Sequence, residues 1–147
     1  MTTSAIQTVR EKTGAGVMEC KRALEEAGGN IEKALEIIHA KGLARAESKQ
    51  TRSTGAGFIV SHIHNGRVGV LMELRTETDF AVKSEQFQEL AHELVLHIAA
   101  MDPENPESLL AQPYVRDESM TVDQLIKNTM AKVGENIRVE RFARFAI

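Results

Sequence analysis

The chain has 147 residues, which suffices for one ordinary domain, or for a small module and a modest core, and excludes a second large domain. Its 18 basic and 21 acidic residues give a formal charge of -3, so the chain as a whole has no attraction to nucleic acid or anionic lipid. One cysteine excludes an internal disulfide framework, and no apolar run approaches the roughly 20 residues that span a membrane, so we expect a soluble, cytoplasmic protein.

The first part of the chain predicts three short helices with tight turns between them. Apolar residues recur at helical spacing in three successive segments, which cover about residues 4–11, 17–27 and 31–42. Ser4 and Gln7 have the spacing of a capping box, and Asn30 is a good N-cap. A module of this size is near the lower limit for independent folding. We assign residues 1–42 to a three-helix module that resembles the ubiquitin-associated type.

The turn Thr13-Gly14-Ala15-Gly16 between the first two helical segments permits two interpretations. Glycines ahead of a helix N-terminus can cradle a phosphate. No strand precedes this turn and no Gly-Lys-Ser/Thr sequence follows it, so a plain interhelical turn is favoured. Cys20 lies on the apolar stripe of the second segment, which favours core packing over catalysis, whereas Met18 points away from that stripe.

Residues 43–55 are expected to form a basic linker. From Lys41 to Arg52 the chain carries four basic residues and one acidic residue, while the apolar content falls. A nucleic-acid-binding arm is the alternative, but the segment holds no aromatic side chain for stacking on bases. A solvated, partly helical linker is favoured, and we expect no direct contact with nucleic acid.

Beyond the linker the apolar period changes from that of a helix to two. Residues 57–64 and 67–76 predict two strands joined by the hairpin turn Asn65-Gly66. The second strand buries one face, formed by Val68, Val70, Met72, Leu74 and Thr76.

Helical spacing then predicts helices over 84–101 and 121–133, with the polar, proline-containing segment 102–119 between them as a surface loop. Residues 137–147 alternate again and predict a third strand. One face of this strand is expected to carry Ile137, Val139, Ala143, Phe145 and Ile147, and the other Phe142 and Ala146. Residues 56–147 should therefore form an α+β core, a three-stranded antiparallel sheet with helices packed on one face.

Two histidines, His62 and His64, share one face of the first expected strand at a spacing that could bind a metal ion. His92 and His97 follow at a spacing that puts them on different helix faces, and neither the cysteine nor a nearby acid completes a ligand set. We therefore expect no metal and no cofactor. A metal-dependent or acid–base enzyme that uses His62, His64 and Asp79 is the alternative from another class of protein.

The junction between the second strand and the next helix places an acid, Asp79, beside a large aromatic, Phe80. Phe80 fits neither the strand stripe before it nor the helix stripe after it, which begins at the expected N-cap Ser84. Phe80 is therefore either a plug for the connector or a side chain held out to insert into a partner. The residues alone leave both interpretations open.

Three separated segments resemble the bacterial elongation factor Ts family. They are Val9–Leu24, with the sequence VREKTGAGVMECKRAL, then Glu77-Thr78-Asp79-Phe80, and Val133-Gly134-Glu135-Asn136-Ile137. The resemblance runs from about residue 4 to residue 147, and three motifs in the right order are much more specific than one. Members of this family are guanine nucleotide exchange factors for elongation factor Tu, the GTPase that carries aminoacyl-tRNA to the ribosome. They perform no covalent chemistry.

The resemblance implies three partner-binding sites. The segment that would enter the GTPase near its magnesium site, disturb that site and promote GDP release consists of Thr78, Asp79, Phe80 and Ala81. The three-helix module would dock on the nucleotide domain through Arg10, Thr13, Gly14, Val17 and Met18. The core contact would be supported by Val133, Gly134, Glu135 and Asn136. The alternative function is a peptide- or ubiquitin-like-binding adaptor without exchange activity.

Two departures from the family pattern bear on these expectations. The family usually has Val-Ala after Asp-Phe, whereas this chain has Ala81-Val82, which keeps the aromatic wedge and changes the neighbouring contact. Longer members carry a second half-core and an inserted helical hairpin, and this chain has neither. Short members pair as homodimers, and the apolar end Phe145-Ala146-Ile147 is consistent with a paired edge. We therefore expect a homodimer joined through the sheet domains.

Overall fold

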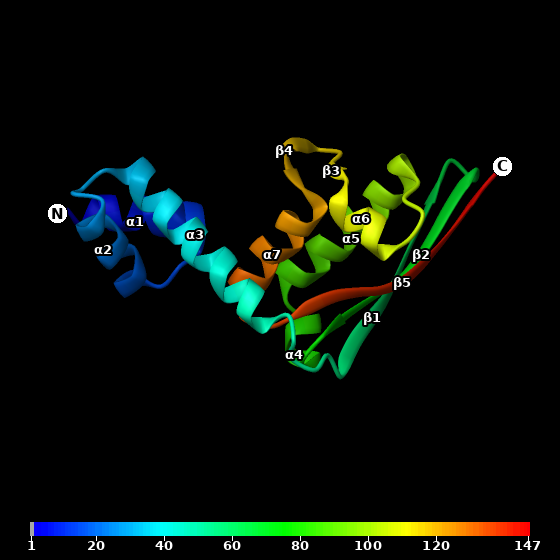
Figure 1. The fold of residues 1–147 in the computed structure, drawn as a ribbon, viewed down its shortest axis with the longest axis horizontal. Helices are drawn as coiled ribbons and strands as arrows, with labels where there is room; N and C mark the ends of the chain where they lie inside the picture. Colours follow the sequence, from blue (N-terminus) through cyan, green and yellow to red (C-terminus); the bar gives the residue numbers. More distant parts are fainter. Residues whose placement is uncertain (1) are drawn as a thin grey trace. The chain divides into compact units, whose positions relative to one another are not determined.

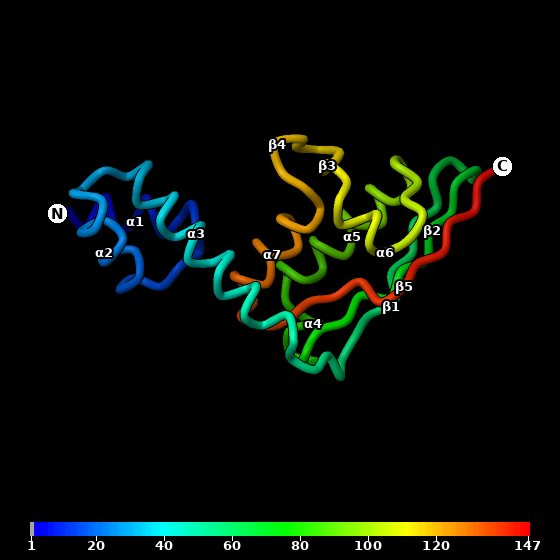
Figure 2. The backbone as a smooth tube through the Cα atoms, in the orientation of Figure 1, coloured from blue at the N-terminus to red at the C-terminus, as the bar shows by residue number. Residues whose placement is uncertain are grey.

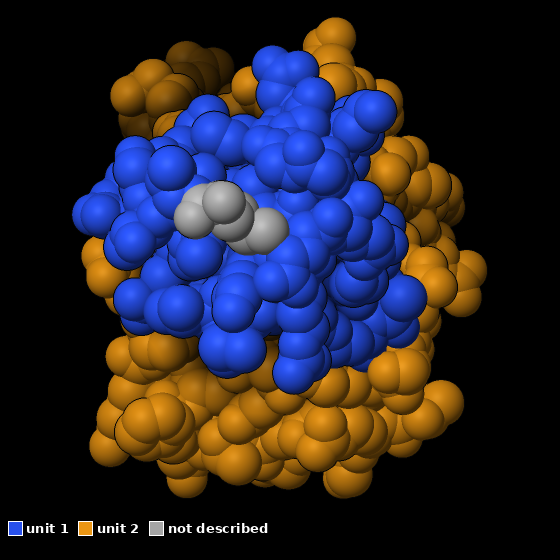
Figure 3. All heavy atoms as spheres, turned by 90° about the vertical axis from the view of Figure 1, so that its left-hand side faces the viewer, with its two compact units in different colours: residues 1–45 blue, residues 46–147 orange. Residues whose placement is uncertain are grey.

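The computed structural model describes residues 2–147 (Figure 1). In chain order its elements are helices α1 (Thr3–Thr13), α2 (Val17–Glu26) and α3 (Ile31–Lys49), strands β1 (Ala56–His64) and β2 (Val68–Thr76), helices α4 (Asp79–Val82), α5 (Glu85–Met101) and α6 (Pro106–Ala111), strands β3 (Pro113–Tyr114) and β4 (Asp117–Thr121), helix α7 (Val122–Val133) and strand β5 (Ile137–Ala146). Two compact units, 1–45 and 46–147, each contain a hydrophobic cluster; Figure 3 colours them separately. The expected α+β class is confirmed.

The helices of the first unit pack around a small apolar cluster. Its fully buried side chains include Val9, Cys20 and Leu24, so the cysteine is a core residue, as expected. The Asn30 cap is confirmed, because its Oδ1 accepts a hydrogen bond from the Lys33 backbone N–H at 3.0 Å. The capping box expected at Ser4 is wrong, because the N-cap of α1 is Thr2, two residues earlier.

Helix α3 does not stop at Gly42, so the predicted end of the third helix is wrong. A glycine inside a helix costs about 1 kcal/mol relative to alanine, which tertiary contacts can offset. The last turns of α3 have such contacts within the second unit: Ala46 is fully buried in its core, and Lys49 Nζ donates to the Gly134 carbonyl at 3.0 Å. Residues 43–49 are therefore helical, and the irregular part of the expected linker begins after Lys49.

The sheet of the second unit has the order β1-β2-β5 and is antiparallel throughout (Figures 1 and 2). The Asn65-Gly66 hairpin is confirmed: both residues have positive φ, 52° and 64°, and the Arg67 N–H donates to the His64 carbonyl at 3.0 Å. The buried stripe of β2 is also confirmed. Helices α5 and α7 cover this face, where Phe87, Leu94 and other apolar side chains form the core.

A β-bulge reverses the two faces of β5. Glu140 faces no residue of β2, because Val139 pairs with Leu74 and Arg141 already pairs with Glu73. One extra residue moves every later side chain to the opposite face. Phe142 therefore packs against the core, whereas the following residues of the outer face are Ala143 and Phe145. The face assignment predicted for the second half of this strand is wrong.

The segment 102–119 is not the surface loop that its composition predicted. Asn105 caps α6, with its Oδ1 accepting from the Ser108 N–H at 2.8 Å, and Pro106 occupies the first turn of the helix. The segment continues as the β3–β4 hairpin. Leu109 is fully buried and Tyr114 nearly so, and both belong to the interior of the second unit.

Predicted helix ends in the core are confirmed by their hydrogen bonds. The Ser84 hydroxyl accepts from the Phe87 N–H at 3.3 Å and so begins α5. Thr121 and Gln124 form a complete capping box at the start of α7, and Gly134, with φ of 80°, ends that helix in the left-handed conformation.

Candidate functional site

Phe80 is the most prominent feature of the junction between β2 and α5. Its side chain is 88% exposed, and those of Thr78 and Asp79 are exposed as well. The next two residues of α4, Ala81 and Val82, are buried, so the single helical turn is anchored on one side only. A plug would be buried, and this exposure therefore excludes the interpretation of Phe80 as a plug for the connector.

Local hydrogen bonds end the strand and begin the turn. Thr76, the last residue of β2, is fully buried, and its hydroxyl donates to the Asn136 carbonyl at 2.9 Å. Thr78 is the N-cap of α4, since its Oγ1 accepts from the Ala81 N–H at 3.2 Å. Asp79 then occupies the first turn, where the helix dipole favours a negative charge.

The carboxylate of Glu135 spans this junction. Its Oε1 accepts from the backbone N–H groups of Glu77 at 3.1 Å and Thr78 at 2.9 Å, and its Oε2 accepts from the Thr78 hydroxyl at 2.7 Å. The Thr76 hydroxyl lies 3.2 Å from Oε1. Burial alone would raise the pKa of Glu135, but hydrogen bonds from Thr78, Thr76 and Glu77 outweigh burial and hold this pKa below its usual value. Glu135 is therefore a carboxylate at neutral pH.

Glu77 in turn accepts a hydrogen bond from the segment that contains Glu135. Glu77 Oε1 accepts from the Asn136 backbone N–H at 2.9 Å and lies 3.1 Å from Arg52 Nε. The Asn136 side-chain amide is buried and donates to the carbonyls of Gln50 at 3.2 Å and Arg52 at 2.8 Å. Two of the three expected sites, 78–81 and 133–136, thus form one hydrogen-bonded assembly.

Within 133–136 each residue has a distinct structural role. Val133 packs on the core, and Gly134 turns the chain out of α7 so that Glu135 and Asn136 reach the junction. Glu77 and Arg52 belong to the same assembly and were missed as site residues by sequence reasoning. Arg52 was noticed only as part of a basic run, and its pairing with Glu77 has no local sequence signal.

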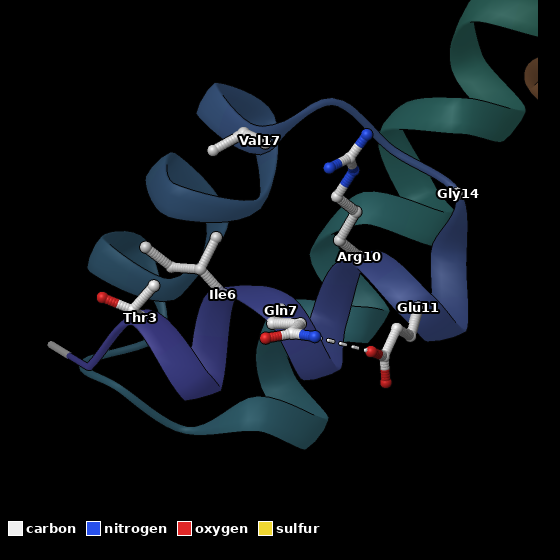
Figure 4. A pocket seen from close by; sticks show the side chains of 7 residues that line it. All are labelled: Thr3, Ile6, Gln7, Arg10, Glu11, Gly14 and Val17. Atoms are coloured by element: carbon white, nitrogen blue, oxygen red, sulfur yellow. Dashed lines mark hydrogen bonds between the residues drawn. The ribbon is translucent and has the colours of Figure 1, made fainter.

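Three of the five residues expected in the first unit line a groove between α1 and α2. Figure 4 shows Arg10, Gly14 and Val17 around it, together with the residues that sequence reasoning missed, which are Thr3, Ile6, Gln7 and Glu11. Val17 and Met18 are both exposed. Thr13 has a different role: its hydroxyl donates to the Val9 carbonyl and accepts from the Ala15 N–H, and so fixes the turn.

The histidines give no metal centre in the described part of the chain. The rings of His62 and His64 are 5.8 Å apart, and residues 2–147 contain no group of three or more candidate ligands placed to hold an ion. His97 is fully buried; its Nδ1 accepts from the Val115 N–H at 3.2 Å, and its Nε2 lies 2.9 Å from Gln112 Oε1. Among the described helices, none is long and apolar enough to cross a membrane.

The sequence of this chain matches known proteins of one family. Residues 77–147 match the family model of elongation factor Ts. This range includes all residues of the hydrogen-bonded assembly from Glu77 to Asn136. The chloroplast elongation factor Ts of Cyanidioschyzon merolae is 41% identical over 191 aligned positions, which cover 97% of this chain and 91% of the relative. Elongation factor Ts of Coprothermobacter proteolyticus is 40% identical, with 98% of this chain and 96% of the relative covered.

The fold and these matches define a translation elongation factor, a protein of protein biosynthesis. The chain belongs to the elongation factor Ts family. The alignment with the Cyanidioschyzon relative has 191 positions although this chain has only 147 residues, so that relative carries internal segments that this chain lacks. In this chain α6 and the short β3–β4 hairpin connect α5 to α7.

Proposed function

We propose that this chain is a guanine nucleotide exchange factor that binds the GDP form of elongation factor Tu, disturbs its magnesium site and promotes GDP release. The observation that carries the proposal is the 88% exposure of Phe80 on a turn whose neighbouring residues are buried or hydrogen-bonded. An exposed aromatic on a fixed turn is suited to insertion into a partner. We place this activity in the cytoplasm, without direct contact with nucleic acid or membrane.

Thermodynamic linkage explains how binding alone promotes release. A partner that binds the nucleotide-free GTPase more tightly than the GDP form must weaken GDP binding by the same factor. Displacement of Mg²⁺ from the GTPase removes the largest positive charge that holds the diphosphate. Full burial of a Phe side chain contributes about 1.5–3 kcal/mol, so Phe80 must share the task with further contacts.

The groove of the first unit supplies such a contact in this proposal. Arg10 and the exposed apolar side chain of Val17 line this groove, and the next residue of α2, Met18, is exposed as well. Contacts of this kind away from the nucleotide add affinity for the GTPase, while Asp79 and Phe80 act where the magnesium is held. In this proposal both kinds of contact are non-covalent, so the exchange factor acts by binding alone.

Release of fluorescent GDP from elongation factor Tu, with and without this protein, tests the proposal. We expect release to accelerate with increasing protein concentration until it saturates. Binding without acceleration would support the alternative function, an adaptor for a peptide or a ubiquitin-like protein. Absence of both binding and acceleration would refute both functions.

We also propose that the protein acts as a homodimer joined through the outer face of its sheet. This face carries Ile63, Leu71 and Phe145, which are 72%, 53% and 79% exposed and come from all three strands. Ile63 and Phe145 flank Gly69 in one cross-strand row, and Leu71 lies in the next row on β2. Such a contiguous apolar patch is typical of an interface, and a two-fold axis would use it on both subunits.

Leu71→Asp tests the dimer, because it places a charge in the patch without touching the core. Sedimentation at micromolar concentration should give twice the chain mass for the wild type and the chain mass for the variant. The matched control is Glu118→Asp, an exposed change on the β4 strand away from the sheet. A monomeric wild type that still releases GDP would refute the need for a dimer.

A further inference from the structure

The hydroxyl of Thr78 has only one proton, and its two contacts fix where that proton points. Thr78 Oγ1 lies 2.7 Å from Glu135 Oε2 and 3.2 Å from the Ala81 backbone nitrogen. The carboxylate can only accept, so the hydroxyl donates to Glu135. Its lone pair is then available for the Ala81 N–H, which is the bond that caps α4. The charge on Glu135 thus orients the cap.

The other carboxylate oxygen binds the backbone directly ahead of the turn. Glu135 Oε1 accepts from two successive N–H groups, those of Glu77 and Thr78, which lie beyond the end of the β2 ladder at Thr76. A helix of four residues cannot stabilise itself, because helix nucleation is unfavourable. The conformation of α4 therefore depends on contacts from outside, and Glu135 supplies three of them.

We propose that Glu135 is a positioning residue for nucleotide exchange, which acts through Thr78 to hold Asp79 and Phe80 in the orientation that enters the GTPase. This inference rests on the proposed exchange function. Glu135 itself need not touch the partner: its oxygens are engaged by the junction of its own chain. Glu135 fixes a turn that is too short to stabilise itself. The conformational entropy of this turn is therefore already lost before the GTPase binds.

The first experiment measures the free protein and needs no GTPase. Amide hydrogen exchange is compared in the wild type, in Glu135→Ala and in the control Glu140→Ala, which removes an exposed carboxylate of β5 paired with Arg138. Glu135→Ala should accelerate exchange at Thr78 and Ala81 by about tenfold or more, the effect of one lost charge-assisted hydrogen bond. The amide of Met72 in the middle of β2 should stay protected. Unchanged exchange at Thr78 and Ala81 would overturn the inference.

The second experiment measures GDP release at saturating protein concentration for Glu135→Ala, Phe80→Ala and the double variant. If Glu135 acts by positioning Asp79 and Phe80, the loss in the double variant should be clearly smaller than the product of the two single losses. Losses that multiply in the double variant would overturn the inference, because a general structural defect would act independently of Phe80. A Phe80→Ala variant as fast as the wild type would instead contradict the proposed function and leave the amide result standing.

Thr78 provides the conservative test of the same chain of contacts. Thr78→Ser keeps the hydroxyl and should retain the protection of the Ala81 amide in the free protein. Thr78→Val keeps the shape and removes the hydroxyl, so it should lose the protection of the Ala81 amide and slow GDP release, while the two backbone N–H bonds to Glu135 Oε1 remain. If Thr78→Val released GDP at the wild-type rate, the hydroxyl would not transmit the effect of Glu135, and the proposed action through Thr78 would be overturned.

Discussion

Phe80→Ala is expected to slow GDP release from elongation factor Tu by about 10- to 150-fold while leaving the free energy of unfolding unchanged. The side chain is 88% exposed in the free protein, and surface substitutions of this kind change stability by about 0.5 kcal/mol or less. In the complex the same side chain can be buried fully, which is worth about 1.5–3 kcal/mol, and 1.4 kcal/mol corresponds to a factor of ten.

The assay is the rate of fluorescent GDP release at saturating exchange factor, with urea unfolding of each variant alongside. Phe87→Ala provides the contrast, because Phe87 is fully buried and its truncation should cost about 3–5 kcal/mol of stability. Val115→Ala, an exposed apolar change in the β3–β4 turn, should alter neither quantity. The role of Phe80 as an exposed wedge would be contradicted if Phe80→Ala released GDP at the wild-type rate, or if it lost several kcal/mol of stability.

Three further predictions concern stability and can be measured by urea unfolding. Leu109→Ala should cost about 2–5 kcal/mol, because Leu109 is fully buried; a loss below 1 kcal/mol would contradict its place in the core. Gly134→Ala should cost about 1–2 kcal/mol, from backbone strain at φ of 80° alone, since an added Cβ meets no atom within 4 Å. Burial lowers the pKa of His97 below its unfolded value, so stability should be complete above about pH 6.5 and fall as the pH drops, and His97→Gln should flatten this profile.

The parts of the fold that the sequence predicted correctly are those set by local chemistry. Alternation in 68–76 identified the buried face of β2, and Asn65-Gly66 identified the hairpin, because two consecutive positive φ angles favour these residue types. The caps at Ser84 and Thr121 are local as well, since each joins groups three residues apart.

The errors arose where distant contacts decide the outcome. The glycine at position 42 is a helix breaker by composition, yet α3 continues to Lys49 because Ala46 packs in the core of the second unit. The bulge at Glu140 leaves no mark in a pattern of alternating apolar residues, since both registers contain a phenylalanine on each face. Segment 102–119 has few apolar residues, and the burial of Leu109 and Tyr114 depends on helices elsewhere in the chain.

In the candidate site, too, contacts between residues distant in the sequence could not be predicted. Two of its motifs were found as separate segments, but the bonds that join them link residues 57 to 59 positions apart, and no periodicity reports such a pairing. Their junction changes the interpretation of Glu135, from a residue expected to support a contact with the partner to one whose oxygens serve its own chain.

An exposed aromatic on a four-residue helix is useful as a wedge only if its direction is set before the partner arrives. A free turn would have to be ordered on binding, at about 1–2 kcal/mol for each residue fixed, and four such residues would offset the whole gain from burying one Phe. The carboxylate of Glu135 and the buried amide of Asn136 remove that cost in the folded protein, because they tie the strand end and the cap of α4 to the segment after α7. Insertion of Phe80 as a wedge therefore depends on the residues that hold the turn as much as on Phe80 itself.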